Sequence, residues 1–489
     1  MLDTAFLTNL AALNCQWAEE TGAVFVIFGA TGDLSRRKLV PALYNLLKDG
    51  HLRKDFFVVL VGRRDGEKDA LLQSLAEGMS QYSRTQPIDP AIRDALLSQV
   101  VYVAEDFGEP SGFSRLRAIL EQRPLPLRLF YLATPSSLYP SILDGLSAAH
   151  LIGEHADADC QTRVVFEKPF GRDLDSAIHL NALARAHLDE SQIYRMDHYL
   201  GKETVQNILV FRFGNSLFEP LWNRKYVSRV RIIATEDIGI VGRGRFYEET
   251  GIIRDVLQNH LLQIAALSAM EAPVSFEADR IRDERAKVFR AFRPLYADQL
   301  SAHAIFGQYD GYTDADEVAA DSRIPTFAAL RLFIDNWRWE GVPFEIIAGK
   351  SLGEKSTRVE IHFRSVPFCL FGKHYVCEKL DPNILTLRIQ PEEGISMQFS
   401  TKTPGDTLQV SPVRMNFDYR ETFSDKAQQE AYEKLLLDAL RGDPTLFARQ
   451  DEVELMWRYV APLIEATEAG TVPLHRYAPG GSGPKEVWK

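Results

Sequence analysis

The first two hundred residues alternate short apolar runs with segments of helical periodicity. The runs at 23–28 and 56–61 are apolar throughout, which is typical of strands that are buried on both faces of a parallel sheet. Further strands are predicted at 100–103, 127–133 and 162–167, with helical segments between them. This repeat of strand and helix predicts an α/β domain with a doubly wound, Rossmann-like parallel sheet.

The pattern changes after residue 201. Helical periodicity extends over 251–271, and strands at 359–364 and 386–390 are separated by loops that contain Pro and Gly. Two helices are expected between 428 and 465, followed by an irregular tail from Gly470. These features predict an α+β domain with a large, mostly antiparallel sheet and helices. The chain is therefore divided into a leader at 1–22, to which we assign no role, an α/β domain at 23–200 and an α+β domain at 201–489.

Composition narrows the functional classes. The 489 residues are 45% hydrophobic and 25% charged, with a formal net charge of −11, which argues against a nucleic-acid or anionic-membrane surface because both need a basic footprint. The four cysteines are scattered without a CxxC spacing, so we expect no disulfide scaffold and no metal site. No signal peptide and no apolar run of about 18 residues is visible, and we expect a cytoplasmic protein.

A glycine-bearing turn follows the first strand directly and precedes a helix expected over 35–47, with Pro41 as a kink. Its residues are Gly29, Ala30, Thr31, Gly32, Asp33 and Leu34. Glycines at such a turn let the backbone approach a pyrophosphate, which then rests on the helix N-terminus. The match to GxGxxG is imperfect, because Thr31 and Leu34 replace two glycines, and a plain tight turn is the alternative. The order of strand, turn and helix favours the dinucleotide site.

The end of the second strand bears on the choice of cofactor. An acidic residue there would accept the ribose hydroxyls of NAD, whereas an arginine would pair with the 2′-phosphate of NADP. Arg63 and Arg64 stand at this place, with Asp65 next to them. The sequence therefore favours NADP and leaves the use of NAD open.

Residues 195–203, with the sequence RMDHYLGKE, gather acid, imidazole, phenol and ammonium groups beside an expected helix start. An anion at such a start gains hydrogen bonds and a favourable field. His198, Tyr199 and Lys202 would be donors to it, while Asp197 is an acceptor that can partner another group. A solvated helix cap is the alternative. Lys168, in the EKPFG segment at 167–171, follows a sheet strand, where α/β sheets usually place their ligands.

His260 lies in an apolar stripe of the helix expected over 251–271, so it faces the interior. An inward histidine is either a satisfied core residue or a base, and Asp197 could orient its ring if the fold brings the two together. Asp255 lies about 140° from His260 on a regular helix, so both reach one ligand only if the helix start is irregular. Lys350 and Lys355 are candidate anion contacts, and Glu236 is a candidate acceptor for a sugar hydroxyl.

Taken together, these segments resemble the glucose-6-phosphate dehydrogenase family. The motifs are GATGDL at 29–34, EKPFG at 167–171, RMDHYLGKE at 195–203, RDVLQNH at 254–260 and DNWRWEGVPF at 335–344. The resemblance extends from about Ala23 to Pro484. One departure lies at 347–350, where this chain reads Ile-Ala-Gly-Lys and many relatives read Arg-Thr-Gly-Lys.

The resemblance implies oxidation of glucose 6-phosphate at C1 to 6-phospho-D-glucono-1,5-lactone with NADP, the first oxidative step of the pentose phosphate pathway. It implies His260 as the base and Asp197 as its partner. The phosphate would be held by His198, Tyr199, Lys202 and Lys355, and the sugar by Lys168, Glu236, Asp255 and Lys350. On the cofactor side it implies the turn at 29–34, Arg63, Asp106, Phe107 and Lys168. It also implies a dinucleotide-binding domain at 23–200 and a substrate-binding and dimerisation domain at 201–489, in a homodimer or homotetramer.

Two other readings stay open on the sequence. A relative of glucose–fructose oxidoreductase would share the dinucleotide domain and the EKP signal but act on unphosphorylated sugars. A nucleotide sensor or assembly partner without catalysis would have kept only the fold. Three donors at one helix start argue against the first reading, and intact His260, Asp197 and Lys202 argue against the second.

Overall fold

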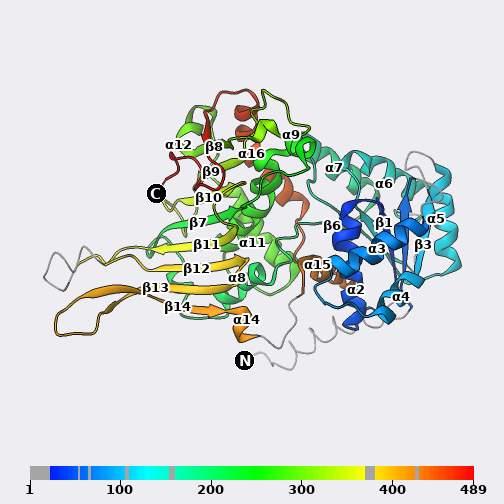
Figure 1. Cartoon of the computed structure of the whole chain (residues 1–489), viewed down its shortest axis with the longest axis horizontal. Coiled ribbons are helices and arrows are strands. Elements are labelled where there is room, and N and C mark those ends of the chain that lie inside the picture. The colour runs from blue at the N-terminus through cyan, green and yellow to red at the C-terminus, as the bar shows by residue number, and fades with distance from the viewer. Residues whose placement is uncertain are drawn as a thin grey trace. The chain divides into compact units, whose positions relative to one another are not determined.

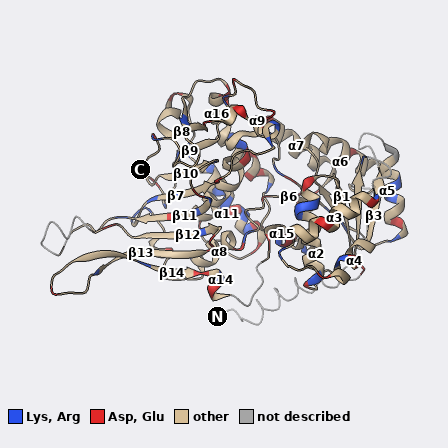
Figure 2. Ribbon diagram, in the orientation of Figure 1, with Lys and Arg blue, Asp and Glu red and all other residues tan. Residues whose placement is uncertain are grey.

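The computed structural model describes residues 22–52, 55–63, 68–104, 110–153, 160–368, 370, 380–423 and 429–488. The described residues form two compact units (Figure 1). The first takes residues up to Gly201 together with Phe276–Arg282 and Gln429–Glu454, and the second takes Lys202–Ser275, Asp283–Gln428 and Leu455–Lys489. Acidic and basic residues are interspersed along the helices of both units (Figure 2).

The first unit is built on a six-stranded sheet in the order β3-β2-β1-β4-β5-β6, in which all neighbours are parallel. Its strands are β1 Ala23–Phe28, β2 Phe57–Gly62, β3 Val100–Ala104, β4 Leu127–Leu132, β5 Gln161–Phe166 and β6 Ile193–Arg195. Every residue of β1, β2 and β4 is buried, because helices surround the sheet (Figure 1). The doubly wound parallel sheet is confirmed.

Helices of this unit are α2 Val40–Lys48, α3 Lys68–Tyr82, α4 Pro90–Ser98, α5 Pro110–Gln122, α6 Tyr139–Ala148, α7 Leu174–His187 and α15 Ala431–Arg441. The single helix expected after the glycine turn is in fact a π-helical segment, η1 Ser35–Leu39, continued by α2. Pro41 is the second residue of α2, so the hydrogen bond that its missing N–H cannot donate falls close to the change from the π-helical to the α-helical segment.

The second unit contains a nine-stranded sheet in the order β14-β13-β12-β11-β7-β10-β9-β8-β15. Its strands are β7 Val227–Thr235, β8 Ala304–Tyr309, β9 Phe327–Leu332, β10 Phe344–Gly349, β11 Ser356–Phe363, β12 Ile384–Gln390, β13 Gly394–Lys402, β14 Val410–Asp418 and β15 Leu474–Tyr477. Only the pairs β7–β10 and β8–β15 are parallel, so the prediction of a mostly antiparallel sheet is confirmed. Figure 1 shows β11 to β14 running side by side, with the β13–β14 hairpin extending beyond the body of this unit.

Helices of the second unit are α8 Glu203–Phe213, α9 Gly244–Ile252, η5 Ile253–Leu261, α10 Leu262–Ala269, α12 Leu300–His303 and α14 Tyr419–Thr422. Two more, α11 Ala278–Arg290 and α16 Gln450–Glu468, have residues in both units. The tail after Gly470, expected to be irregular, contains β15 instead. Tyr477 anchors this strand, since its ring is buried and its hydroxyl donates to the Lys350 carbonyl at 2.7 Å.

A search of the described helices finds no segment with the length and apolar character needed to cross a bilayer. Within the same residues, no cluster of three or more His, Cys, Asp or Glu side chains is arranged to hold a metal ion.

Candidate active site

The glycine turn lies where the strand order of the first unit reverses. Gly29 has φ of +80° and donates its N–H to the Val61 carbonyl at 3.1 Å, and a Cβ atom on it would lie 2.6 Å from the Ala133 carbonyl oxygen. Only glycine fits this backbone. The turn therefore sits at the carboxyl ends of β1, β2 and β4, which is the switch point where doubly wound sheets bind their ligands. Thr31, Gly32 and Asp33 are exposed there.

Arg63 directly follows β2 and its side chain is exposed. It therefore stands at the strand end where a 2′-phosphate would be read. Arg64 and Asp65 lie outside the described residues, as do Asp106 and Phe107.

Lys168 follows β5 by way of Glu167, a buried carboxylate at the centre of a hydrogen-bonded cluster. The Lys168 N–H donates to Glu167 Oε2 at 3.3 Å, and the hydroxyls of Tyr131 and Tyr432 also donate to this carboxylate. Burial raises the pKa of Glu167, and these donors oppose the rise. The Lys168–Pro169 peptide bond is cis.

Asp197, His198 and Tyr199 follow β6. Asp197 is buried, and its Oδ1 accepts the Tyr199 N–H at 2.9 Å while its carbonyl accepts the Leu200 N–H at 3.0 Å. This turn fixes the carboxylate at the strand end. The His198 ring lies 5.1 Å from the Tyr199 ring and is stacked on Tyr432 of α15, with centroids 6.1 Å apart and planes 15° from parallel.

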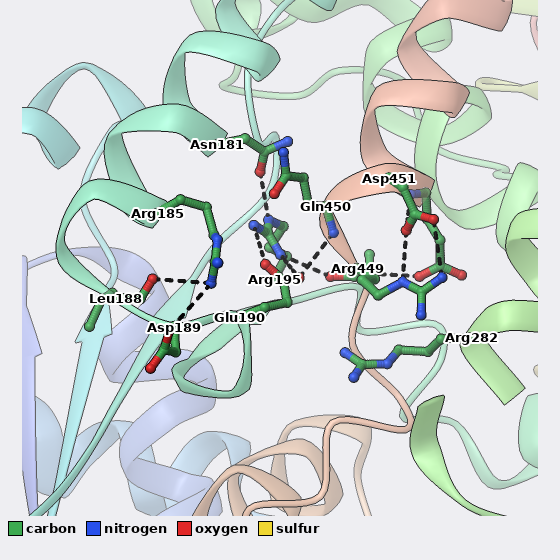
Figure 3. Close-up of polar contacts among 12 residues, drawn as sticks. Asn181, Arg185, Leu188, Asp189, Glu190, Arg195, Arg282, Arg449, Gln450 and Asp451 are labelled. Carbon is green, nitrogen blue, oxygen red and sulfur yellow. Dashed lines mark hydrogen bonds and ion pairs between the residues drawn. The ribbon is translucent and has the colours of Figure 1, made fainter. Parts of the chain in front are cut away.

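Arg195, two residues before Asp197, anchors this strand end (Figure 3). Its guanidinium is 2% exposed and donates to both oxygens of Glu190, at 2.6 and 3.2 Å, and to Asn181 Oδ1 at 3.0 Å. It also lies 5.0 Å from the centroid of the Phe170 ring. Burial lowers the pKa of the Arg195 guanidinium, and Glu190 opposes this shift. The arginine that opens the RMDHYLGKE segment thus serves the interior of the first unit.

In the second unit, Lys202 forms the N-cap of α8, so a helix does start at the RMDHYLGKE segment. The Lys202 ammonium donates to Gln390 Oε1 at the end of β12, and Gln390 Nε2 donates to Thr357 Oγ1 at 3.1 Å. Gln390 is therefore a neighbour of the candidate donor that sequence reasoning missed, since the two are far apart in the chain.

Lys350 is buried between two candidate carboxylates. It follows β10, is 1% exposed, and its Nζ lies 2.9 Å from Glu236 Oε2 and 3.6 Å from Asp255 Oδ2. The same ammonium lies 5.4 Å from the centroid of the Tyr247 ring. Burial and then Asp255 raise the pKa of the Tyr247 phenol well above its usual value. Three of the predicted sugar contacts thus form one ion-paired group, whereas Lys355 is exposed.

His260 and Asp255 both lie in the π-helix η5, between α9 and α10. Gly251, with φ of +56°, breaks α9 just before it. A π-helix has an i to i+5 repeat, so residues five apart return to about the same face. The irregular start needed for Asp255 and His260 to share a face is therefore present. His260 is 2% exposed, which agrees with its place in the apolar stripe.

The predicted residues thus form two groups. In the first unit the glycine turn, Arg63, Lys168, Asp197, His198 and Tyr199 gather at the carboxyl ends of parallel strands. The second unit holds Lys202, Glu236, Asp255, His260, Lys350 and Lys355. The structure adds Arg195, Tyr432, Gln390 and Tyr247 as neighbours of these residues. Of the four, only Arg195 falls in a segment that the sequence had singled out.

Comparison with known proteins matches two family models to successive parts of the chain. Residues 26–207 match the family described as glucose-6-phosphate dehydrogenase, NAD binding domain, and 209–489 match its C-terminal domain. A glucose-6-phosphate 1-dehydrogenase of Treponema pallidum (strain Nichols) is 41% identical over 94% of this chain and 92% of its own length. The enzyme of that name from Bacillus subtilis (strain 168) is 40% identical over 96% of each.

Solved structures agree. A glucose-6-phosphate dehydrogenase in complex with its substrate glucose-6-phosphate superposes with a TM-score of 0.86 at 35% identity, over 95% of this chain and 96% of that one. A levoglucosan dehydrogenase in complex with NADH and levoglucosan is 8% identical with a TM-score of 0.51, over 92% of this chain and 98% of that one. The latter is a likeness of fold alone.

Proposed function

Because this chain belongs to the glucose-6-phosphate dehydrogenase family, we propose that it oxidises glucose 6-phosphate at C1 to 6-phospho-D-glucono-1,5-lactone and transfers the hydride to NADP. The observation that carries the proposal is the likeness, over 95% of this chain, to a relative with glucose 6-phosphate bound. The ion-paired group of Lys350, Glu236 and Asp255 supports it, since a sugar offers hydroxyls to carboxylates and an ammonium alike.

The chemistry needs a base, because a hemiacetal hydroxyl does not lose its proton unaided near neutral pH. His260 takes the proton from the C1 hydroxyl, and the C1 hydride leaves as the carbonyl of the lactone forms. Asp197 holds the ring tautomer of His260 and stabilises its protonated form. NADP, when bound, accepts the hydride. A positioned base of this kind contributes roughly 100- to 10,000-fold to the rate.

Binding energy at the far end of the substrate orients the reacting carbon. His198, Tyr199, Lys202 and Lys355 hold the phosphate, and Lys168, Glu236, Asp255 and Lys350 hold the sugar. Lys350 holds both carboxylates in place, because its ammonium lies within 4 Å of each. The two alternatives, an oxidoreductase of unphosphorylated sugars and a nucleotide sensor, give these phosphate-binding residues no role.

The residues at the proposed cofactor site suit the binding of NADP. The turn at 29–34 is exposed at Thr31, Gly32 and Asp33, and its glycines allow a pyrophosphate to approach the backbone closely. Exposed Arg63 pairs with the 2′-phosphate. Asp106 and Phe107 are proposed at the adenine side, and Lys168 reaches both cofactor and sugar.

We further propose that the protein is cytoplasmic, as two Arabidopsis thaliana relatives are named, and that it forms a homodimer or homotetramer through the second unit's sheet. Strand β14 supports this assembly, because it is an edge strand of the sheet that the described residues form and its Met415 is 65% exposed. Light scattering coupled to size-exclusion chromatography measures the oligomeric state, and a monomer would contradict it.

The test of the reaction is absorbance at 340 nm with purified protein. Glucose 6-phosphate and free glucose are compared as substrates, each with NADP and with NAD. Reduction of NADP that requires the phosphorylated sugar supports the proposal. Equal rates with NAD and NADP would contradict the proposed role of Arg63 but not the dehydrogenase activity. Equal rates with free glucose would contradict the proposed phosphate-binding residues. No reduction under any condition would favour a nucleotide sensor.

A further inference from the structure

Glu167 is the centre of a cluster that the proposed reaction does not use. Its carboxylate accepts the hydroxyls of Tyr131 on β4 and Tyr432 on α15. The Glu167 carbonyl accepts the Tyr139 hydroxyl at 3.1 Å. A buried carboxylate held by two phenols and a backbone N–H is fixed in position, because each donor limits its rotation.

Tyr432 connects this cluster to His198. Its ring lies against the His198 imidazole, with centroids 6.1 Å apart and planes 15° from parallel. The hydroxyl at the other end of the same ring is held by Glu167. Tyr432 can therefore not swing away from His198 without losing this hydrogen bond, and the stack itself sets the plane of its ring.

A stacked aromatic face also suits a histidine that binds an anion. The face of a tyrosine ring is the negative end of its quadrupole and attracts a cation placed over it. A protonated imidazole is such a cation, and a phosphate favours the protonated ring. The stack thus orients the His198 ring, whose N–H groups can donate to a phosphate.

We propose that Tyr432 is a positioning residue for substrate phosphate, which holds the His198 imidazole in the plane and place where it donates to the phosphate. The inference rests on the proposed function, because it takes His198 as a phosphate donor. The inference gives α15 a role in substrate selection. The sequence predicts this helix only as one of a C-terminal pair.

Two variants separate the contribution of the ring stack from that of the hydrogen bond to Glu167. Tyr432→Leu removes the stack, and Tyr432→Phe keeps the stack and removes the hydrogen bond to Glu167. Steady-state kinetics are measured with glucose 6-phosphate and with free glucose. Tyr432→Leu is expected to raise KM for glucose 6-phosphate about tenfold, the size of one oriented hydrogen bond to a charged group, with a smaller effect on kcat and on free glucose. Tyr432→Phe is expected to lie between Leu and the wild type.

The wild type and a double-mutant cycle keep the two proposals distinguishable. A wild type that does not prefer glucose 6-phosphate over glucose overturns the proposed function. With that preference present, Tyr432→Leu should have no further effect on KM in a His198→Ala background, since both changes remove the same contact. Additive effects, an equal loss with both sugars, or an unchanged KM would overturn the role of Tyr432.

Controls exclude a general loss of structure. Tyr44→Phe removes a different buried phenol of the same unit, one that accepts the Asp89 N–H at 2.6 Å, and should leave the preference for the phosphorylated sugar unchanged. If Tyr432→Leu does not fold, the cycle is run with Tyr432→Phe, which loses one atom only. An unchanged KM in that variant, together with additivity, overturns the proposal in the same way.

Discussion

The Lys350 ammonium lies 2.9 Å from Glu236 Oε2 and is almost completely buried. A buried ammonium persists only when carboxylates compensate its charge, and Asp255 supplies the second one at 3.6 Å. Removal of the cation would leave two carboxylates close together. The pair therefore connects the stability of the second unit with the geometry of the candidate sugar site.

Lys350→Met is expected to lower the free energy of unfolding by about 3 kcal/mol and to raise KM for glucose 6-phosphate at least tenfold, because the two carboxylates then repel each other. Urea unfolding and steady-state kinetics measure the two effects. Lys225→Met, at an exposed lysine of the same unit, is the control and should change neither. Wild-type KM in Lys350→Met would contradict the proposed sugar site.

His260→Asn is expected to lower kcat by about 100-fold or more while KM for glucose 6-phosphate stays near the wild-type value, because asparagine cannot accept the proton. Initial rates at 340 nm over a range of substrate concentrations give both constants. His303→Asn tests a histidine of the same unit, whose Nδ1 contacts the Arg331 carbonyl, and should retain kcat. Retention of kcat in His260→Asn would remove this residue from the role of base.

Arg63→Ala is expected to raise KM for NADP by about tenfold or more and to leave KM for NAD nearly unchanged, because only NADP carries the 2′-phosphate that a guanidinium would bind. The ratio of the two KM values is the measurement. Arg93→Ala, on α4 and paired with its neighbour Asp94, should keep the wild-type ratio. Equal increases for both cofactors would indicate that Arg63 contacts something other than the 2′-phosphate.

The first half of the parallel sheet could be predicted from the sequence because β1, β2 and β3 are short apolar runs. β1 and β2 can be recognised from their own residues, without knowing which strands they pair with. Both faces of these strands are buried, so apolar residues do not alternate with polar ones. The glycine turn was visible for the same reason, as it directly follows such a run. Chain order then gave the order of strand and helix, and the doubly wound arrangement follows from it.

The second unit could be predicted only as a class. β7 pairs in parallel with β10 and antiparallel with β11, and no local pattern specifies which distant strands meet. β15 was missed because a four-residue strand of mixed polarity, Leu474–Tyr477, has too little periodicity to stand out from a loop. A single division near residue 200 likewise gave no indication that Gln429–Glu454 packs in the first unit.

In the candidate site, residue types could be predicted and supporting contacts could not. The sequence marks Lys350 as a candidate but gives no sign that it is buried with Glu236, which precedes it by many residues. The π-helix around His260 depends on where Gly251 breaks α9. The sequence pattern alone predicts a regular α-helix over the same residues. The Tyr432–His198 stack joins segments that only the fold brings together.

Arg195→Met is expected to lower the free energy of unfolding by about 3–5 kcal/mol, because it leaves Glu190 and Asn181 without the buried guanidinium that both contact. Arg195→Lys should lose less but still be destabilised, since an ammonium cannot bind both Glu190 oxygens as a fork does. Denaturant unfolding checks both. Arg185→Met, in the exposed pair with Asp189 at 3.8 Å (Figure 3), should change stability by about 0.5 kcal/mol or less.

Asp438 on α15 provides a prediction on pH. Burial raises its pKa to about 6, against the favourable charge of Lys434. The folded state therefore binds this proton more tightly than the unfolded state does, so the stability it confers is present below the ordinary carboxyl pKa of 3.8 and is lost as pH rises through about 6. Asp438→Asn should thus gain stability relative to wild type between pH 4 and pH 7, by at most about 3 kcal/mol.

The difference in unfolding free energy between Asp438→Asn and wild type, measured at several pH values, checks this sign. Asp94→Asn, at a carboxylate whose side chain is 65% exposed, should show a flat difference over the same range. A flat difference for Asp438→Asn would mean that the carboxylate pays no burial penalty in the folded protein.

The late position of α15 in the chain has a consequence for synthesis on the ribosome. Asn45 and Arg84 emerge early, whereas Glu433, which accepts hydrogen bonds from both, emerges near the end. Domains generally fold as units in the order of their synthesis, but the first unit receives Gln429–Glu454 only after most of the second unit has been translated. The nascent first unit must therefore persist without α15 until then, and a chain that stops within the second unit's sheet leaves both units unfinished.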